Sequence, residues 1–314
     1  MEIVNGAHPT VITPYTKEGE VDYETLKKYI KWYGDNGCTG VFSLCHSSEI
    51  AQLTADEMVK FNRTVYDTAM DYNKNHDNKL NVVTSGHIWG SITEQAKVLN
   101  RIAETGTDAL VLVTNRFDPD NTGDEKWIED AEKLLKLIPK DIPLGLYECP
   151  LPYKRLASPK IFEWCLSTGR FVYMKDTCCD MEIINNRLSI LKGSKFKLFN
   201  ANCQTLRESL LAGASGYCGI MCNFHPRLYA WMLEHYKEDS KKVKLLQDFI
   251  GTLGFIENGL PYPLTAKYNM NLCGIPTENF ARNRISSEMT PYGENCIEQM
   301  KEMADYVYSV ISAE

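Results

Sequence analysis

Short apolar runs alternate with amphipathic stretches along the first two thirds of the chain, and this alternation limits the folds that it can adopt. Strands that alternate with helices pair in parallel through right-handed crossovers. Eight such units predict an α/β protein with a closed (β/α)8 TIM barrel, and a doubly wound open sheet is the alternative. We interpret as strands the apolar runs at 9–15, 40–45, 80–86, 108–113, 143–147, 171–174, 195–200 and 216–221.

Helix-start signals stand between these runs. Asp22 precedes a stretch whose apolar residues recur at helical spacing. Thr54 and Ser91 each stand three residues before a glutamate, which is the pattern of a capping box. Ser158 is followed by Pro159, which suits the first position of a helix. These positions predict four helix starts.

The alternation stops near residue 225. We therefore predict two parts, a barrel over residues 1–225 and a C-terminal helical extension over residues 226–314 that packs on the barrel. The extension should contain helices near 226–237, 240–257, 262–273 and 292–312.

Charge and composition exclude several classes of function. The formal net charge of −7 argues against nucleic acid or an anionic membrane as a partner. No apolar run reaches the roughly 18 residues of a membrane span. Eleven cysteines, without a targeting pattern at the start of the chain, indicate reduced thiols in a cytoplasmic protein.

The sequence contains no pattern typical of a cofactor site. It has neither a G-x-G-x-x-G segment nor a P-loop, so we expect no nucleotide. Cys178, Cys179, Cys218 and Cys222 are soft metal ligands in principle, but they lie on different predicted loops. We interpret them as small thiols and expect no cofactor.

Lys175 follows the apolar run at 171–174, at the carboxyl end of a predicted strand. In a TIM barrel the chemistry takes place at this end of the strands. One interpretation is a lysine that extends its ammonium group into water. The other is an amine in a dry pocket, with a pKa low enough to form a Schiff base with a carbonyl substrate. The strand alone does not decide between them.

Four segments resemble the dihydrodipicolinate synthase and N-acetylneuraminate lyase family of class I aldolase-type enzymes. The resemblance covers nearly the whole chain and implies a (β/α)8 barrel with C-terminal helices, a homotetramer, and a lysine Schiff base with pyruvate or a related 2-oxo acid. It places Lys175 on the family's Schiff-base lysine and Tyr147 on its catalytic tyrosine. The segments are AHPTVITPY at 7–15, PLGLYECP at 143–150, VYMKDTCCD at 172–180 and GASGYCGIMCN at 213–223.

The loop that binds the substrate carboxylate in this family departs from the family pattern. Gly-Thr-Thr-Gly-Glu is replaced by the residues from Cys45 to Glu49. In register, Ser47 keeps a hydroxyl, and His46 replaces the hydroxyl that relays protons to the tyrosine. Both glycines are absent, so we expect strain if Cys45 or Ser48 must adopt a positive φ.

Residues that bind the second substrate in the family are also replaced. The relay tyrosine after the fourth strand is missing, and Asn115, Arg116 and Phe117 occupy that region. The synthase arginine that binds the incoming substrate is Pro152 here, with Lys154 and Arg155 shortly after it, and the sugar-binding Gly-Asp-Glu of the lyase is Ala201-Asn202-Cys203. We therefore expect a divergent member with a different substrate.

These comparisons define a predicted site. We expect Lys175, Tyr147 and His46 to be catalytic. The alternative for His46 is a structural role in its loop. We expect the substrate to be bound by Ser47, Ser48, Cys218 and Asn115.

Other polar residues are interpreted structurally. Glu49 should hold its loop through backbone N–H groups, and Glu148 should face away from Tyr147 across the strand. His87 is either a pocket wall or a turn residue. We expect Arg282 and Arg284 to make surface or helix-to-barrel contacts.

The predicted function is that of a Schiff-base lyase or aldolase that acts on pyruvate or a related 2-oxo acid. The alternatives are a Schiff-base dehydratase of a keto-deoxy sugar acid and a non-catalytic binding member of the family. The expected partners are a small 2-oxo acid and other copies of the chain in a tetramer.

Overall fold

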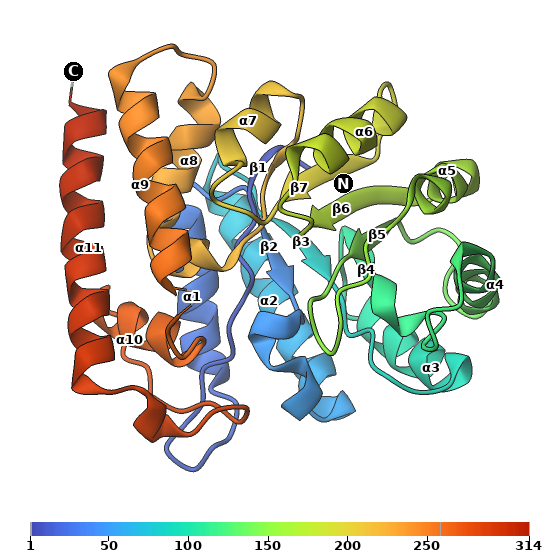
Figure 1. The fold of residues 1–314 in the computed structure, drawn as a ribbon. Helices are drawn as coiled ribbons and strands as arrows, with labels where there is room; N and C mark the ends of the chain where they lie inside the picture. The colour runs from blue at the N-terminus through green and yellow to red at the C-terminus, as the bar shows by residue number, and fades with distance from the viewer. Residues whose placement is uncertain (1, 258, 314) are drawn as a thin grey trace.

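The computed structural model describes residues 2–257 and 259–313, and its centre is a parallel sheet of eight strands that curves into a barrel (Figure 1). The strands follow one another in the order β1-β8-β7-β6-β5-β4-β3-β2. A bridge between Thr10 and Phe42 joins the two edges of the sheet. The predicted TIM barrel is confirmed, and the open doubly wound sheet is excluded.

Most predicted strands are present with ends shifted by a few residues. The predicted strand at 9–15 is wrong, because the first strand ends at Ala7 and residues 9–15 form only isolated bridges. Pro9 and Pro14 have no N–H to donate to a strand ladder, which explains this. The strands are β1 (Gly6–Ala7), β2 (Gly40–Ser43), β3 (Asn81–Thr84), β4 (Ala109–Val113), β5 (Leu144–Tyr147), β6 (Phe171–Asp176), β7 (Lys197–Asn200) and β8 (Gly216–Tyr217).

The helix starts predicted from the sequence are confirmed. Asp22 and Ser158 accept backbone N–H groups at the starts of their helices, and Thr54 and Ser91 form complete capping boxes. The helices that follow the strands are α1 (Tyr23–Asp35), α2 (Ala55–Asn75), α3 (Ile92–Ala103), α4 (Asp124–Leu135), α5 (Pro159–Thr168), α6 (Met181–Leu191), α7 (Leu206–Leu211) and α8 (Pro226–His235).

Three further helices follow α8 and lie together on one side of the barrel, opposite α3, α4 and α5 (Figure 1). They are α9 (Lys241–Glu257), α10 (Leu264–Leu272) and α11 (Pro291–Ser312). The helix α11 packs against α8, α9 and α10. The helix α8 also contacts β1, and the division of the chain after residue 225 stays a prediction. No helix within the described residues is long and apolar enough to cross a membrane.

The pleat of the strands determines which side chains reach the barrel interior. Successive residues of a strand point to opposite faces of the sheet. Phe42, Val111, Tyr147 and Tyr173 belong to an apolar cluster inside the barrel. The neighbours of Tyr147 and Lys175, which are Glu148 and Asp176, therefore face the surrounding helices.

Candidate active site

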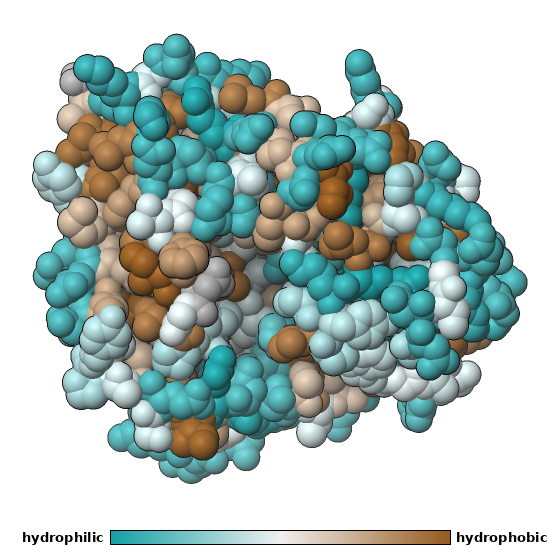
Figure 2. All heavy atoms as spheres, in the orientation of Figure 1, coloured by the Kyte–Doolittle hydropathy of each residue, from teal (hydrophilic) through white to brown (hydrophobic). Residues whose placement is uncertain are grey.

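A cavity of about 380 Å³ opens beside the carboxyl ends of the strands. Its lining comes from the loop after β2, the ends of β5 and β6, the loop after β7, and the segments around α9 and α10. Figure 2 shows a hollow near the centre of this face, with apolar surface beside it on the side of the C-terminal helices. The lining includes His46, Ser47, Tyr147, Lys175, Tyr217 and Arg284.

Lys175 and Tyr147 face each other across neighbouring strands. They are direct partners in the register of β5 and β6. The Nζ atom of Lys175 lies 4.4 Å from the centre of the Tyr147 ring and 5.6 Å from that of Phe42. The side chain of Lys175 is only 4% exposed, so its amine does not extend into bulk water. The fully buried carboxylates Glu49, Glu148 and Asp176 pair with cations other than Lys175.

The hydroxyl of Tyr147 lies in a thiol-rich part of the barrel. Burial raises the pKa of Tyr147 well above its usual value, and the neighbouring thiols of Cys149 and Cys45 raise it further. The phenol is therefore protonated at neutral pH. A protonated phenol beside an amine can donate a proton to the oxygen that leaves the carbon atom to which the amine has added.

His46 begins a short 3-10 helix, η1 (His46–Ser48), and lines the cavity. Burial lowers the pKa of His46, and the positive charges of Lys175 and Arg116 lower it further. The imidazole is therefore neutral at neutral pH and can accept a proton. The structure brings His46, Tyr147 and Lys175 to one cavity.

The two serines of this loop have different environments. The hydroxyl of Ser47 donates to Thr10 Oγ1 at 3.1 Å and lines the cavity. The hydroxyl of Ser48 donates to the carbonyl of Val11 and accepts from the N–H of Cys45 at 3.2 Å. Ser48 is fully buried and is not part of the described cavity lining. The structure thus brings Ser47, but not Ser48, to the cavity.

The loss of both family glycines leaves no strain at their positions. Cys45 has an extended backbone with φ of −108°, and Ser48 lies inside η1 without a positive φ. The left-handed conformation falls instead on Leu44 and Glu49, with φ of 50° and 57°. The expectation of strain at Cys45 and Ser48 is therefore wrong, because the positive φ angles fall on Leu44 and Glu49, on either side of that segment.

Glu49 joins the active-site loop to the C-terminal part of the chain. Its carboxylate accepts from Lys267 Nζ at 2.8 Å, and from the backbone N–H groups of Arg282 and Asn283 at 2.6 and 3.2 Å. Burial lowers the pKa of Lys267 to about 8, although Glu49 opposes this shift. The expectation that Glu49 holds its loop through backbone N–H groups is confirmed. Its ion pair with Lys267 is a further contact that no local pattern indicated.

Asn115 and Cys218 lie near the site without lining the described cavity. The amide of Asn115 donates to the backbone carbonyls of Cys149, Leu151 and Tyr153, at 3.0, 3.1 and 2.6 Å. Asn115 therefore fixes the loop after Tyr147. Cys218 is fully buried, and burial raises the pKa of its thiol to about 11, so the thiol stays protonated.

Two polar residues that the sequence placed near the site support the scaffold. The ring of His87 accepts from the N–H of Val113 at 2.9 Å and contacts Gln95 Oε1 at 2.7 Å. His87 is fully buried and is not part of the described cavity lining. Arg155 pairs with Asp118 at 2.7 Å in a buried ion pair.

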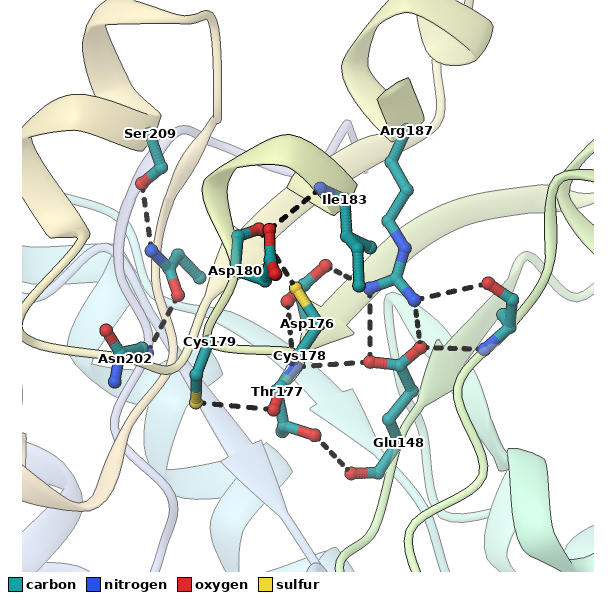
Figure 3. A network of polar contacts seen from close by, with 12 residues as sticks. Glu148, Asp176, Thr177, Cys178, Cys179, Asp180, Ile183, Arg187, Asn202 and Ser209 are labelled. Atoms are coloured by element: carbon teal, nitrogen blue, oxygen red, sulfur yellow. Dashed lines mark hydrogen bonds and ion pairs between the residues drawn. The ribbon is translucent and has the colours of Figure 1, made fainter. Parts of the chain in front are cut away.

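A buried charge network joins Glu148, Asp176 and Arg187 (Figure 3). The guanidinium of Arg187, on α6, contacts Glu148 at 2.5 and 3.2 Å and also pairs with Asp176. Glu148 additionally accepts from the N–H groups of Ala157 and Thr177, at 2.8 and 3.2 Å. The expectation that Glu148 faces away from the cavity is confirmed. Because Glu148 and Asp176 follow Tyr147 and Lys175 directly, this network fixes the ends of both strands.

Arg284 is a cavity residue that the sequence did not reveal. It lies between α10 and α11 and lines the cavity together with Lys154. The interpretation of Arg284 as a surface contact holds only in part. Arg284 pairs with Glu288 at 2.9 Å, but it also lines the cavity. No local pattern marks this position, since the chain must fold before the segment reaches the barrel.

The described residues contain no group of three or more His, Cys, Asp or Glu side chains that could hold a metal ion. All eleven cysteines are free, and seven of them are buried. The amine of Lys175, the phenol of Tyr147, the imidazole of His46 and the hydroxyl of Ser47 are among the groups that line the cavity.

Comparisons with known proteins agree with this geometry. Residues 4–303 match the model of the dihydrodipicolinate synthetase family. A 4-hydroxy-tetrahydrodipicolinate synthase from Coxiella burnetii is 22% identical over 313 residues, which cover 96% of this chain and 98% of the relative. A relative with the same name from Methanococcus aeolicus is 24% identical and covers 87% of this chain and 90% of its own length.

Solved structures show the same fold. A putative dihydrodipicolinate synthetase from Pseudomonas aeruginosa superimposes with a TM-score of 0.83 at 17% identity, over 96% of this chain and 99% of its own. Dihydrodipicolinate synthase from Acinetobacter baumannii, solved in complex with pyruvate, superimposes with a TM-score of 0.80 at 18% identity over the same shares of the two chains.

Proposed function

The chain belongs to the dihydrodipicolinate synthetase family, and from this premise we propose that it is a class I lyase or aldolase that holds pyruvate or a related 2-oxo acid as a Schiff base on Lys175. One observation carries the proposal. A lysine amine with 4% exposure lies 4.4 Å from the ring of a buried tyrosine, in a cavity that contains a neutral imidazole.

The first step is binding of the 2-oxo acid. Its carboxylate needs fixed hydrogen-bond donors. The hydroxyl of Ser47 faces the cavity and can turn from Thr10 towards a bound anion. The loop that carries Ser47 is fixed by the hydrogen bond from Ser48 to the carbonyl of Val11 and by the ion pair of Glu49 with Lys267.

The second step is formation of the imine. The amine of Lys175 attacks the carbonyl carbon in its unprotonated form and gives a carbinolamine, which must lose water. Tyr147 lies beside Lys175 and is protonated at neutral pH. It donates a proton to the departing hydroxyl, and His46 accepts or returns protons in the same cavity. The protonated imine then withdraws electrons, so that a bond from C3 to C4 can form or break.

The second substrate differs from those of the two named family activities. Pro152 replaces the synthase arginine, and Ala201-Asn202-Cys203 replaces the sugar-binding segment of the lyase. The imine chemistry itself does not depend on these positions. We therefore propose that this chain shares the first half-reaction, with pyruvate, with the two family activities and uses a different second substrate in the second half-reaction.

Borohydride trapping tests the proposal directly. Incubation with pyruvate and borohydride should reduce the imine and add the mass of the reduced pyruvate group to one peptide, the one that contains Lys175. The variant Lys175→Ala should show neither adduct nor turnover and should keep its fold, because removal of a buried amine relieves a desolvated charge.

The second lysine of the cavity is an internal control. Lys154 lines the same cavity but is exposed, whereas Lys175 is buried beside Tyr147, so we expect no trapping on Lys154. An adduct on Lys154, or turnover that survives in Lys175→Ala, would sink the proposal. Product analysis with candidate sugar acids then separates carbon bond cleavage from dehydration.

A further inference from the structure

The cavity has a charge that is opposite to that of the protein as a whole. The chain carries 41 acidic and 34 basic residues. Among the described residues that line the cavity, however, none is aspartate or glutamate, whereas Lys154, Lys175 and Arg284 are present. A hollow lined by charge of one sign concentrates ligands of the opposite sign.

A single 2-oxo acid does not account for this excess of positive charge. Its carboxylate meets the loop of Ser47, and the imine nitrogen of Lys175 keeps the positive charge of that residue. Lys154 and Arg284 remain, and both lie at the rim, defined here as the solvent-exposed part of the lining. The nearest buried carboxylates, Glu148 and Asp176, face away from the cavity and are paired with Arg187.

The two rim cations are held in place by one backbone contact each. Lys154 Nζ donates to the carbonyl of Thr177 at 2.7 Å, and Thr177 lies two residues after Lys175. Arg284 Nε donates to the carbonyl of Tyr262 at 3.3 Å, and its NH1 group pairs with Glu288 at 2.9 Å. An ammonium has three N–H donors and a guanidinium has five, so both keep donors free for a ligand.

The amide side chains of the lining, Asn202 and Gln204, offer few free acceptors. Asn202 Oδ1 accepts from the N–H and hydroxyl of Thr205, at 3.0 and 2.9 Å. Gln204 Oε1 accepts from Asn202 Nδ2 at 2.7 Å, and Gln204 Nε2 donates to Gly251 O at 2.8 Å. The free capacity of the rim is therefore mainly that of charged donors, which suits a carboxylate or a phosphate.

We propose that Arg284 and Lys154 bind a second anionic group, a carboxylate or a phosphate, on the molecule that reacts with the 2-oxo acid held by Lys175. This inference rests on the proposed function and names the substrate class of the same site. The position that binds the second substrate in the synthase is Pro152 here and has no charge. The two cations reach the cavity from other segments, one of them from the C-terminal part of the chain.

Matched pairs of 2-oxo acids test the proposal with the full-length protein. The members of each pair have the same number of carbons and differ in the terminal group: 2-oxopentanoate with 2-oxoglutarate, and 2-oxohexanoate with 2-oxoadipate. A 2-oxo acid with a terminal phosphonate forms a third arm. The measurement is the concentration that gives half-maximal borohydride trapping on Lys175, at low and at moderate salt.

The dianionic acid should give half-maximal trapping at a concentration about tenfold lower than its monoanionic partner in at least one pair, because hydrogen bonds between charged groups are strong. Salt should reduce this ratio. The terminal group, carboxylate or phosphonate, that gives half-maximal trapping at the lower concentration identifies the natural anion.

Variants then assign the effect to residues. In Arg284→Gln and in Lys154→Met the ratio should fall towards one. In Glu288→Gln the ratio should rise. This change removes the carboxylate that competes with the ligand for Arg284 and keeps the shape of the side chain. Arg101→Gln is the control, since Arg101 has a similar exposure and pairs with Asp56 on the surface, and its ratio should match that of the wild type.

The outcomes separate this proposal from the proposed function. If pyruvate itself is not trapped on Lys175, the proposed function fails. If pyruvate is trapped but every matched pair gives the same half-saturation within about twofold, less than the effect expected of a charged hydrogen bond, only the anion site is refuted. A ratio that persists unchanged in the Arg284→Gln and Lys154→Met double variant also refutes it.

Discussion

Replacement of Arg187 by methionine should destabilise the protein strongly. Arg187 is 3% exposed and donates four hydrogen bonds, to Glu148, Asp176 and the carbonyl of Ala157. Methionine fills much of the same volume but has no charge. The substitution therefore leaves two fully buried carboxylates, Glu148 and Asp176, next to each other without a cation.

The expected loss follows from the burial of these groups. Removal of one partner from a buried ion pair costs about 3–5 kcal/mol, because the remaining charge stays desolvated. This is a large share of the roughly 5–15 kcal/mol that stabilises a typical folded protein. Arg187→Met should therefore lower the free energy of unfolding by about 3–5 kcal/mol at neutral pH.

The loss should also depend on pH. Burial already raises the pKa of Glu148, and the charge of Arg187 opposes that shift. Without Arg187 this opposition disappears, so the pKa of Glu148 rises further above its value in the unfolded chain. A group with a raised folded pKa stabilises the protein below its unfolded pKa and loses this contribution as pH rises. The difference between variant and wild type should therefore be larger at pH 8 than at pH 5.

Urea unfolding followed by circular dichroism at both pH values measures these differences. The triple variant Arg187→Met, Glu148→Gln, Asp176→Asn removes all three charges and should recover much of the stability. Arg187→Lys keeps a charge without the two-pronged geometry and should fall between wild type and Arg187→Met. A loss below about 1 kcal/mol that is the same at both pH values, as for an exposed pair, would show that these carboxylates are not desolvated as described.

Three further predictions concern proton transfer, acid stability and assembly. His46→Thr should lower kcat by a factor of about 10² to 10⁴. Protonation of His46 should make kcat of the wild type decline below pH 6.5, because the pKa of His46 is lowered from that value, and this decline should be absent from the variant. Superimposable pH profiles would exclude His46 from the mechanism. Burial lowers the pKa of His8, His87 and His225 to about 3. Because these folded pKa values lie below the unfolded value, stability should be highest above pH 6.5 and fall by up to about 1.4 kcal/mol per pH unit for each histidine on acidification; equal urea midpoints at pH 7 and pH 5 would contradict this. Light scattering at micromolar concentration should give a mass above the 35.7 kDa of one chain, and the family resemblance implies four copies; a monomer refutes it.

The architecture was predictable from the sequence because it depends on local signals. Alternating apolar runs and capping residues such as Asp22 and Thr54 act within a few residues of their own position. The carboxyl ends of parallel strands meet at one end of a barrel, so the proximity of Tyr147 and Lys175 followed from the fold class. The first strand was misplaced, because its apolar residues stand between two prolines that cannot donate to a ladder.

The rest of the site was decided by contacts between distant segments. The carboxylate of Glu49 meets Lys267, and the carboxylates of Glu148 and Asp176 meet Arg187 on another element. Arg284 reaches the cavity only because the C-terminal helices fold back beside the barrel. The burial that lowers the pKa of His46 and raises that of Tyr147 likewise exists only in the folded chain. A sequence states which charges are present, but burial and distance set their energies, and these arise when the segments pack together.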